Sequence, residues 1–234
     1  MKKIIYSLFI CLAFVLSSCE DETSQDTSKI TYFVDLEVYG DAQMFWEKGI
    51  PFEEPGYSAI LDGEDVTGDV KITTNLNIDK GGIYNIKYSA VNEDGFAKEF
   101  TRIVYVYDTT ESPIESGFFT VTKDSYRNSS GTIVAYGNSY PIVIIQEEPG
   151  KFYVSDFFGG WYDKRAGYGS VYTMPGYFKL NADNSIELIS SQMIGGWGDS
   201  LDGMNAGKYD PATNSIYWEA GYAGSMSFNV TLTK

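Results

Sequence analysis

The chain has 234 residues, of which 32 are acidic and 17 basic, giving a net charge of −15, with two cysteines and no histidine. This length allows one or two domains that each bury a hydrophobic core. The missing histidine excludes Ser-His-Asp and Cys-His catalysis and His-ligated metals. The acidic balance disfavours nucleic acid as a partner, because neutralising phosphates requires clustered Lys and Arg. Aromatic residues make up 16% of the chain beside 24 glycines, which is typical of folded, turn-rich, all-β proteins.

The N-terminus has the features of an export signal. Two lysines precede an apolar run over residues 4–15, which is too short to cross a bilayer as a helix, since that requires about 20 residues. Residues 16–19, Leu-Ser-Ser-Cys, resemble the bacterial lipobox. The resemblance implies a lipoprotein signal peptide over residues 1–18, removed before Cys19, and acylation of the Cys19 thiol. The alternative is an ordinary secretory peptide with an incidental cysteine.

A lipid anchor, rather than charge, is expected to hold the mature chain on a membrane. Acyl chains on Cys19 give durable anchoring, whereas an acidic body is repelled by anionic head groups. Residues 20–22, Glu-Asp-Glu, resemble the acidic export signal of Bacteroidetes lipoproteins, which implies an outer-membrane location facing the extracellular side. Periplasmic retention is the alternative. Polar residues 23–28 are expected to complete a tether over residues 19–29.

Residues 30–108 show the alternation of β-strands. Residues 82–91 are expected to form a strand with Tyr84, Ile86 and Tyr88 on one face, followed by a turn and a returning strand over residues 98–107. The segments that carry a family resemblance are residues 47–59, 62–66, 82–84 and 102–106. They resemble the bacterial immunoglobulin-like domains of surface proteins. The resemblance implies an immunoglobulin-like β-sandwich that spaces another domain from the membrane, with no activity of its own.

Residues 109–113 break the alternation with small polar residues and a proline, which indicates a linker. The tripeptide Asp-Thr-Thr at residues 108–110 resembles sites that Bacteroidetes O-glycosylate on exported proteins. Whether Thr109 is modified or belongs to an unmodified linker remains open at this point.

Residues 114–234 hold 16 of the 24 glycines and three of the four tryptophans. Strands are expected at residues 117–123, 132–136, 140–146, 151–156, 176–180, 186–190, 207–209, 215–220 and 225–232. Short strands joined by hairpins predict an antiparallel meander that curls into a barrel or sandwich, because closure removes exposed edges. Within the last but one strand, alternation places Trp218 in the core. The whole chain resembles two-domain Bacteroidetes surface lipoproteins of uncharacterised function.

The connection over residues 157–172 is too aromatic for an ordinary solvated loop, and its Gly-Gly-Trp step recurs at residues 195–197. The faces of Trp and Tyr suit the apolar faces of sugar rings, and neighbouring Asp and Arg side chains can hydrogen-bond hydroxyl groups. The candidate glycan-binding residues are Trp161, Tyr162, Asp163, Arg165, Tyr168, Tyr172, Trp197 and Asp199. The alternative is that both tryptophans plug one end of the barrel.

No other motif indicates a site of chemistry. Residues 199–205 contain three Asp or Asn side chains, which raises the possibility of a calcium site. They lack the ligand pattern and closing glutamate of an EF-hand, and Asx residues are common in turns. No phosphate-binding fingerprint occurs. We therefore expect no metal, no cofactor and no catalytic residues.

Three functions remain. The first is a non-catalytic outer-membrane surface lipoprotein that binds a polysaccharide or other glycan for a neighbouring outer-membrane transport system. The second is a structural or protein-interaction component of the cell surface. The third is a hydrolase with paired carboxylates, for which no spacing singles out a pair. An exposed Trp161 or Trp197 favours the first function, and burial of both favours the second.

Overall fold

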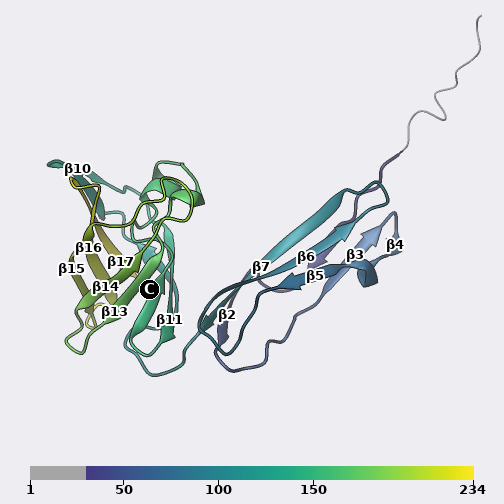
Figure 1. Cartoon of the computed structure of the whole chain (residues 1–234), viewed down its shortest axis with the longest axis horizontal. Helices are drawn as coiled ribbons and strands as arrows, with labels where there is room; N and C mark the ends of the chain where they lie inside the picture. Colours follow the sequence, from purple (N-terminus) through teal and green to yellow (C-terminus); the bar gives the residue numbers. More distant parts are fainter. Residues whose placement is uncertain (1–29) are drawn as a thin grey trace, which may run out of the picture.

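The structure is a computed structural model that describes residues 30–234. The expected signal peptide, Cys19 and the tether lie outside the described residues. Two β domains follow one another and meet at one end of each (Figure 1). Within residues 30–234, no helix has the length and apolar character needed to cross a membrane.

The first domain is a sandwich of two sheets. One sheet contains β1 (Asp35–Val38), β3 (Tyr57–Leu61) and β4 (Glu64–Asp65); the other contains β2 (Gln43–Glu47), β7 (Ala97–Tyr107), β6 (Gly82–Val91) and β5 (Lys71–Thr74). The pairs are antiparallel except for β2, which runs parallel to β7. Between the sheets lies a core that includes Ala59, Ile86, Tyr88, Val104 and Val106. The predicted immunoglobulin-like sandwich is thus confirmed, and β6 has the bounds that its alternation predicts.

The second domain is a single curled antiparallel sheet. Its strands are β8 (Gly117–Val121), β9 (Tyr126–Ser129), β10 (Thr132–Ala135), β11 (Pro141–Glu148), β12 (Lys151–Val154), β13 (Gly176–Leu180), β14 (Ile186–Ser191), β15 (Gly203–Asp210), β16 (Ser215–Tyr222) and β17 (Met226–Thr233). Pairing runs from β14 through β13, β12, β11 and β8 to β17, and then through β16 to β15. A bridge between Ser185 and Lys208 brings β15 back beside the start of β14, so the sheet almost closes into a barrel.

One strand of this domain was not predicted. β9 forms a hairpin with β10 and also pairs with β17, so the hairpin extends the sheet beside the barrel. The sequence of β9, Tyr-Arg-Asn-Ser, has no apolar alternation. Its place in the sheet comes from pairing with β17, whose paired residues lie 97 to 103 positions further along the chain. The sequence analysis therefore missed β9, which lies next to the barrel end.

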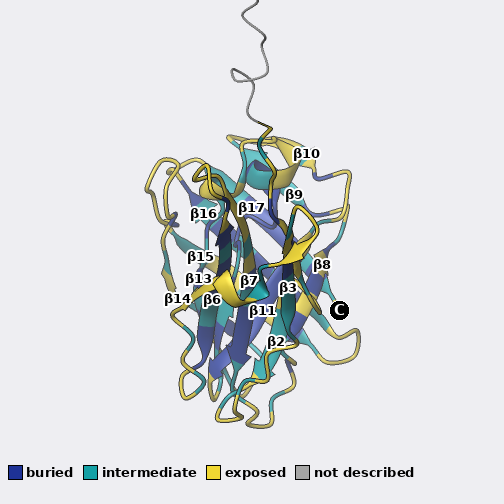
Figure 2. Ribbon diagram, turned by 90° about the vertical axis from the view of Figure 1, so that its right-hand side faces the viewer, coloured by how far each residue is buried: buried dark blue, intermediate teal, exposed yellow. Residues whose placement is uncertain are grey.

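The interior of the barrel is filled with aromatic rings. Trp218 is fully buried, as alternation along β16 predicts, and its indole N–H donates to the carbonyl oxygen of Phe157 at 2.8 Å. Phe119, Phe152, Phe178 and other apolar side chains pack around it. Figure 2 shows buried residues along the middle of the strands and exposed residues in the loops at both ends. Loops at the ends of such a rigid scaffold are where binding residues are most often found.

The two domains share an apolar joint. Phe45, Ile103 and Tyr105 of the first domain pack with Val143 and Ile145 of the second. Phe45 also meets Phe118 edge-on, with ring centroids 5.1 Å apart. At the margin of this joint the backbones touch, because a Cβ added to Gly81 would lie 2.5 Å from the carbonyl oxygen of Glu147.

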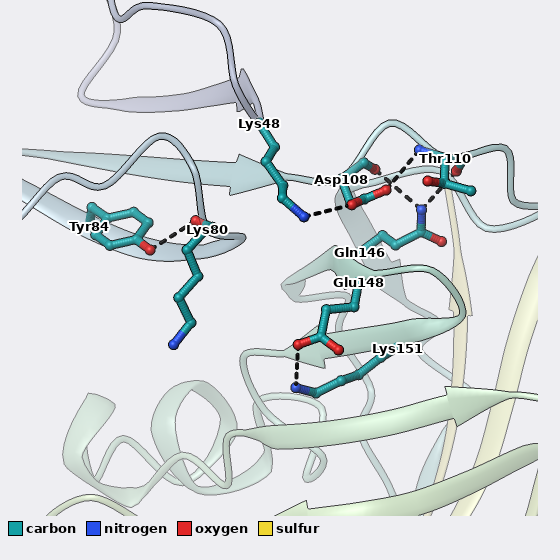
Figure 3. A network of polar contacts seen from close by, with 8 residues as sticks. All are labelled: Lys48, Lys80, Tyr84, Asp108, Thr110, Gln146, Glu148 and Lys151. Carbon is teal, nitrogen blue, oxygen red and sulfur yellow. Dashed lines mark hydrogen bonds and ion pairs between the residues drawn. The ribbon is translucent and has the colours of Figure 1, made fainter.

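Polar contacts tie the linker to the same joint (Figure 3). The Lys48 ammonium lies 2.9 Å from the Asp108 carboxylate. The side-chain amide of Gln146 donates to the carbonyl oxygens of Thr110, at 2.7 Å, and Asp108, at 3.3 Å. The described domains are therefore docked, and in Figure 1 they diverge upward from the joint. The upper ends carry both the start of the described chain and the green segment that includes residues 161–172.

Candidate functional site

A buried carboxylate organises the long aromatic connection. Asp156 follows β12 and is almost inaccessible. Its carboxylate accepts hydrogen bonds from the backbone N–H groups of Phe158 at 2.9 Å, Gly160 at 2.8 Å and Met174 at 2.8 Å. Both ends of the connection are thus held by one side chain. Burial raises the pKa of Asp156 to about 6, and the three N–H donors oppose that rise.

The connection is more ordered than a plain loop. Gly159 and Gly160 have φ of +59° and +82°, values that favour glycine. They lead into η3 (Trp161–Arg165), one turn of π-helix closed by hydrogen bonds such as that from the N–H of Arg165 to the carbonyl oxygen of Gly160 at 3.0 Å. A short 3₁₀ turn, η4 (Ser170–Tyr172), follows. The two glycines thus start a short helical turn within a domain that is otherwise nearly all β, as its sequence predicts.

Trp161 is the plug of the barrel end. Only 3% of the residue is exposed. Its ring meets Tyr136 and Phe228 at centroid distances of 5.1 and 6.2 Å, and Tyr162 beside it is also buried. The structure thus corrects the expectation that Trp161 and Tyr162 offer faces to a ligand, and agrees with the alternative that Trp161 is core.

Trp197 lies differently. It is 48% exposed, and Tyr168 is 53% exposed. The Trp197 ring lies 4.8 Å from the Tyr172 ring and 6.1 Å from the Tyr168 ring, centroid to centroid. We call Tyr168, Tyr172 and Trp197 the aromatic platform. Tyr162 forms its floor, stacked on Tyr168 at 5.9 Å and edge-on to Trp197 at 5.0 Å.

The turn that presents Trp197 is tightly built. The N–H of Met193 donates to the carbonyl oxygen of Asp199 at 2.8 Å, and the Gln192 amide donates to that of Gly198 at 2.7 Å. Gly196 has φ of +49°, and a Cβ added there would lie 2.7 Å from the carbonyl oxygen of Val171. The second Gly-Gly-Trp segment is therefore pressed against the first loop, which fixes the platform in place.

The three polar residues predicted to bind a glycan differ in their exposure and in the partners they already have. Asp199 is exposed, and one of its carboxylate oxygens accepts a hydrogen bond from the Tyr222 hydroxyl at 2.7 Å. Asp163 pairs with Lys164 at 3.0 Å. Arg165 is exposed, and its Nε donates to the carbonyl oxygens of Ala135 and Tyr136, both at 3.2 Å. Asp199 and Arg165 are thus the accessible polar groups among those predicted.

Sequence reasoning missed three residues around the platform. Val171 and Ile194 are exposed apolar side chains, 49% and 78% accessible, on the two loops that build it. Arg127, on the unpredicted strand β9, lies 4.7 Å from the centre of the Trp161 ring. No local pattern distinguishes Arg127 from a solvated arginine, because its position depends on the pairing of β9 with β17.

A separate hollow of about 420 Å³ lies at the tip of the first domain. Its lining includes the four carboxylates of Asp62, Glu64, Glu93 and Asp94 and contains no platform residue. Within residues 30–234, no group of three or more acidic or cysteine side chains is arranged to hold a metal ion. This hollow is therefore distinct from the aromatic platform, which is the feature best suited to recognition.

Comparison with known proteins supports the two-domain organisation. A family model described as a bacterial surface protein, Ig-like domain, matches residues 36–106, and a model described as a C-terminal domain matches residues 108–234. No curated protein matches the chain. Two structures with carbohydrate-binding modules of Clostridium perfringens ZmpB match at 18% and 16% identity, each over 53% of this chain. They are covered over 15% and 31% of their own length, with TM-scores of 0.29 and 0.27, which are too low to indicate a shared fold.

A much stronger match is the crystal structure of the lipoprotein BT2262 from Bacteroides thetaiotaomicron. It is 51% identical, covers 86% of this chain and 100% of its own, and has a TM-score of 0.76. The similarity spans both domains. The chain therefore belongs to the same family of two-domain bacterial surface lipoproteins as the Bacteroides protein.

Proposed function

We propose that this protein is a non-catalytic outer-membrane lipoprotein, acylated at Cys19, that binds a glycan on the aromatic platform. The observation that carries the proposal is the half-exposed indole of Trp197 between the rings of Tyr168 and Tyr172. An open aromatic face supplies a large, rigid contact area for the apolar face of a sugar ring. The exposed side chains of Asp199 and Arg165 supply polar partners for hydroxyl groups nearby.

The platform is fixed before a ligand arrives. Its loops are held by the Asp156 carboxylate, by the π-helical turn and by the contact of Gly196 with Val171. A preformed surface loses little conformational entropy on binding, so more of the contact energy remains as affinity. This arrangement supports recognition rather than a purely structural role for the loops.

The location of the platform supports a role beside the membrane. In Figure 1 the platform loops and the start of the described chain lie at the upper ends of the two domains. We infer that a lipid on Cys19 holds this side of the molecule, and the platform with it, near the membrane. A glycan held there is close to neighbouring outer-membrane transport proteins, to which it would be passed.

A protein-interaction role is the second candidate, and one observation favours it. Ile194 is 78% exposed and Val171 49% exposed beside the platform. Exposed apolar side chains grouped in this way also suit contact with a protein partner.

The test is a titration of intrinsic tryptophan fluorescence of the soluble chain from residue 20 against a panel of polysaccharides. We expect a saturable shift with at least one polysaccharide. Isothermal titration calorimetry, which does not need the indole, should show an affinity at least about tenfold weaker for Trp197→Ala, because tenfold corresponds to about 1.4 kcal/mol and the indole supplies the largest apolar contact of the platform. Ile194→Ser is the matched control and should leave glycan binding unchanged. A silent panel, or binding that Trp197→Ala does not weaken while Ile194→Ser does, contradicts the glycan proposal.

A further inference from the structure

The arginines of this protein are few, and they differ in whether a carboxylate pairs with them. The chain has three, at positions 102, 127 and 165. Arg102 is buried in the first domain, where its guanidinium pairs with the Glu54 carboxylate at 2.8 Å. Arg127 and Arg165 belong to the second domain, and no ion pair of the described residues involves either of them. In a chain with 32 carboxylates, two arginines without a carboxylate partner are unexpected.

Both unpaired arginines lie against one indole. The guanidinium carbon of Arg127 is 4.7 Å from the centre of the Trp161 ring, and that of Arg165 is 4.2 Å from it. The ring stabilises each cation through its π-electrons, but it does not cancel their charge. Two positive groups held near each other without a counter-ion repel one another and attract an anion.

Some nitrogen atoms of these two arginines also lack hydrogen-bond partners among the described residues. The Nε atom of Arg127 is buried and has no hydrogen-bond partner. Arg165 is exposed and uses its Nε for the carbonyl oxygens of Ala135 and Tyr136, while its terminal nitrogens make no hydrogen bond to the described residues. Buried polar groups are nearly always satisfied, whereas the guanidinium of Arg127 is incompletely hydrogen-bonded by the described residues.

The two arginines beside Trp161 lie next to the aromatic platform. Trp161, the ring that carries both guanidinium groups, and Tyr162 pack against the same ring of Phe228, at centroid distances of 6.2 and 5.7 Å. The ring of the same tyrosine is the floor under Tyr168 and Trp197. The nearest acidic side chain on η3, Asp163, is already paired with Lys164. A ligand on the platform thus has two uncompensated guanidinium groups next to it.

We propose that Arg127 and Arg165 form an anion subsite that receives the carboxylate of an acidic sugar, a uronic acid, within a glycan whose ring stacks on Trp197. The planar fork of a guanidinium binds a carboxylate through two parallel hydrogen bonds, so it distinguishes an acidic sugar from its neutral counterpart. The inference rests on the proposed function for the stacking contact, and adds the chemical class of the ligand.

The experiment compares oligogalacturonate with its fully methyl-esterified form, which keeps the sugar and removes the charge. The wild-type chain should bind the acid at least about tenfold more tightly than the ester at low salt. Arg165→Gln should abolish this preference by weakening binding of the acid much more than binding of the ester, and Arg165→Lys should restore only part of the preference. Lys179→Gln, which removes an exposed cation of β13, is the charge-matched control and should keep the preference.

A second readout separates this inference from the proposed function. The ¹⁵N–¹H signal of the Arg165 Nε group should shift on titration with galacturonate alone and not with galactose. Equal affinity for acid and ester in the wild type, or tighter binding of dextran sulfate than of oligogalacturonate, overturns the subsite and leaves glycan binding intact. A silent Arg165 signal with galacturonate overturns the subsite even if the platform binds no polymer.

Discussion

The two tryptophans that follow Gly-Gly steps should respond oppositely to removal. Trp161 is 3% exposed, so Trp161→Ala returns nearly a whole indole to water. A buried tryptophan covers about 150 to 250 Å², and at about 25 cal/mol per Å² this gives about 4 to 6 kcal/mol. Large-to-small core substitutions of aromatic residues cost about 3 to 5 kcal/mol, in agreement. For a domain of this size, that loss lowers the melting temperature by about 15 °C or more.

Trp197 is 48% exposed, so the same substitution there removes only about half of such a contact, at most about 2 to 3 kcal/mol. Urea unfolding followed by far-ultraviolet circular dichroism measures the free energy of unfolding of both variants, because this signal does not depend on the tryptophan that has been removed. Trp161→Ala should lower the free energy of unfolding by about 3 to 5 kcal/mol, whereas Trp197→Ala should mainly weaken glycan binding. If Trp161→Ala costs less than about 1 kcal/mol, or the two variants are equally destabilised, the assignment of Trp161 as the plug is wrong.

Three further predictions concern the backbone and one buried acid. Gly196→Ala should weaken glycan binding at least about tenfold, measured by fluorescence titration, because its Cβ would lie 2.7 Å from a backbone carbonyl; Gly198→Ala, with nothing within 4 Å, should weaken it less. Gly81→Ala should open the domain joint and enlarge the radius of gyration in small-angle X-ray scattering, whereas Gly68→Ala, in open space, should not; unchanged scattering from both would argue against a tight joint. Because burial raises the pKa of Asp156 from 3.8 to about 6, the folded state keeps a proton that the unfolded chain releases between these values. The contribution of Asp156 to the free energy of unfolding is full below pH 3.8 and is lost as the pH rises through about 6, by about 3 kcal/mol. Urea unfolding at several pH values should show this loss in the wild type and not in Asp156→Asn. An equal pH dependence of the free energy of unfolding in both proteins would refute the assignment.

The strands were largely predictable from local pattern. Residues 176–180 form β13 with the predicted bounds, and the alternation around Trp218 correctly identifies its buried face. Both depend on neighbours within a few residues, which a sequence displays directly. β9 escaped prediction because its polar residues join the sheet through β17, a partner distant along the chain.

The site was only half predictable, for a related reason. Trp161 and Trp197 have the same two residues before them, so local sequence gives them the same expectation. Their difference comes from what packs on each ring: Phe228 and two arginines contact Trp161, whereas Trp197 is 48% exposed. Such long-range packing also decides that Tyr162 is a floor and not a contact surface.

The joint between the domains limits how this chain can be divided. Its linker, with small polar residues and a proline, looks like a place where a module can be cut out and moved to another protein. Yet Val143 and Ile145 are covered by the first domain, and Phe45 and Tyr105 by the second. A cut at the linker would leave each half with a bare apolar face prone to association. The second domain therefore depends on the first to cover its apolar face, and the two domains should be expressed and engineered as one piece.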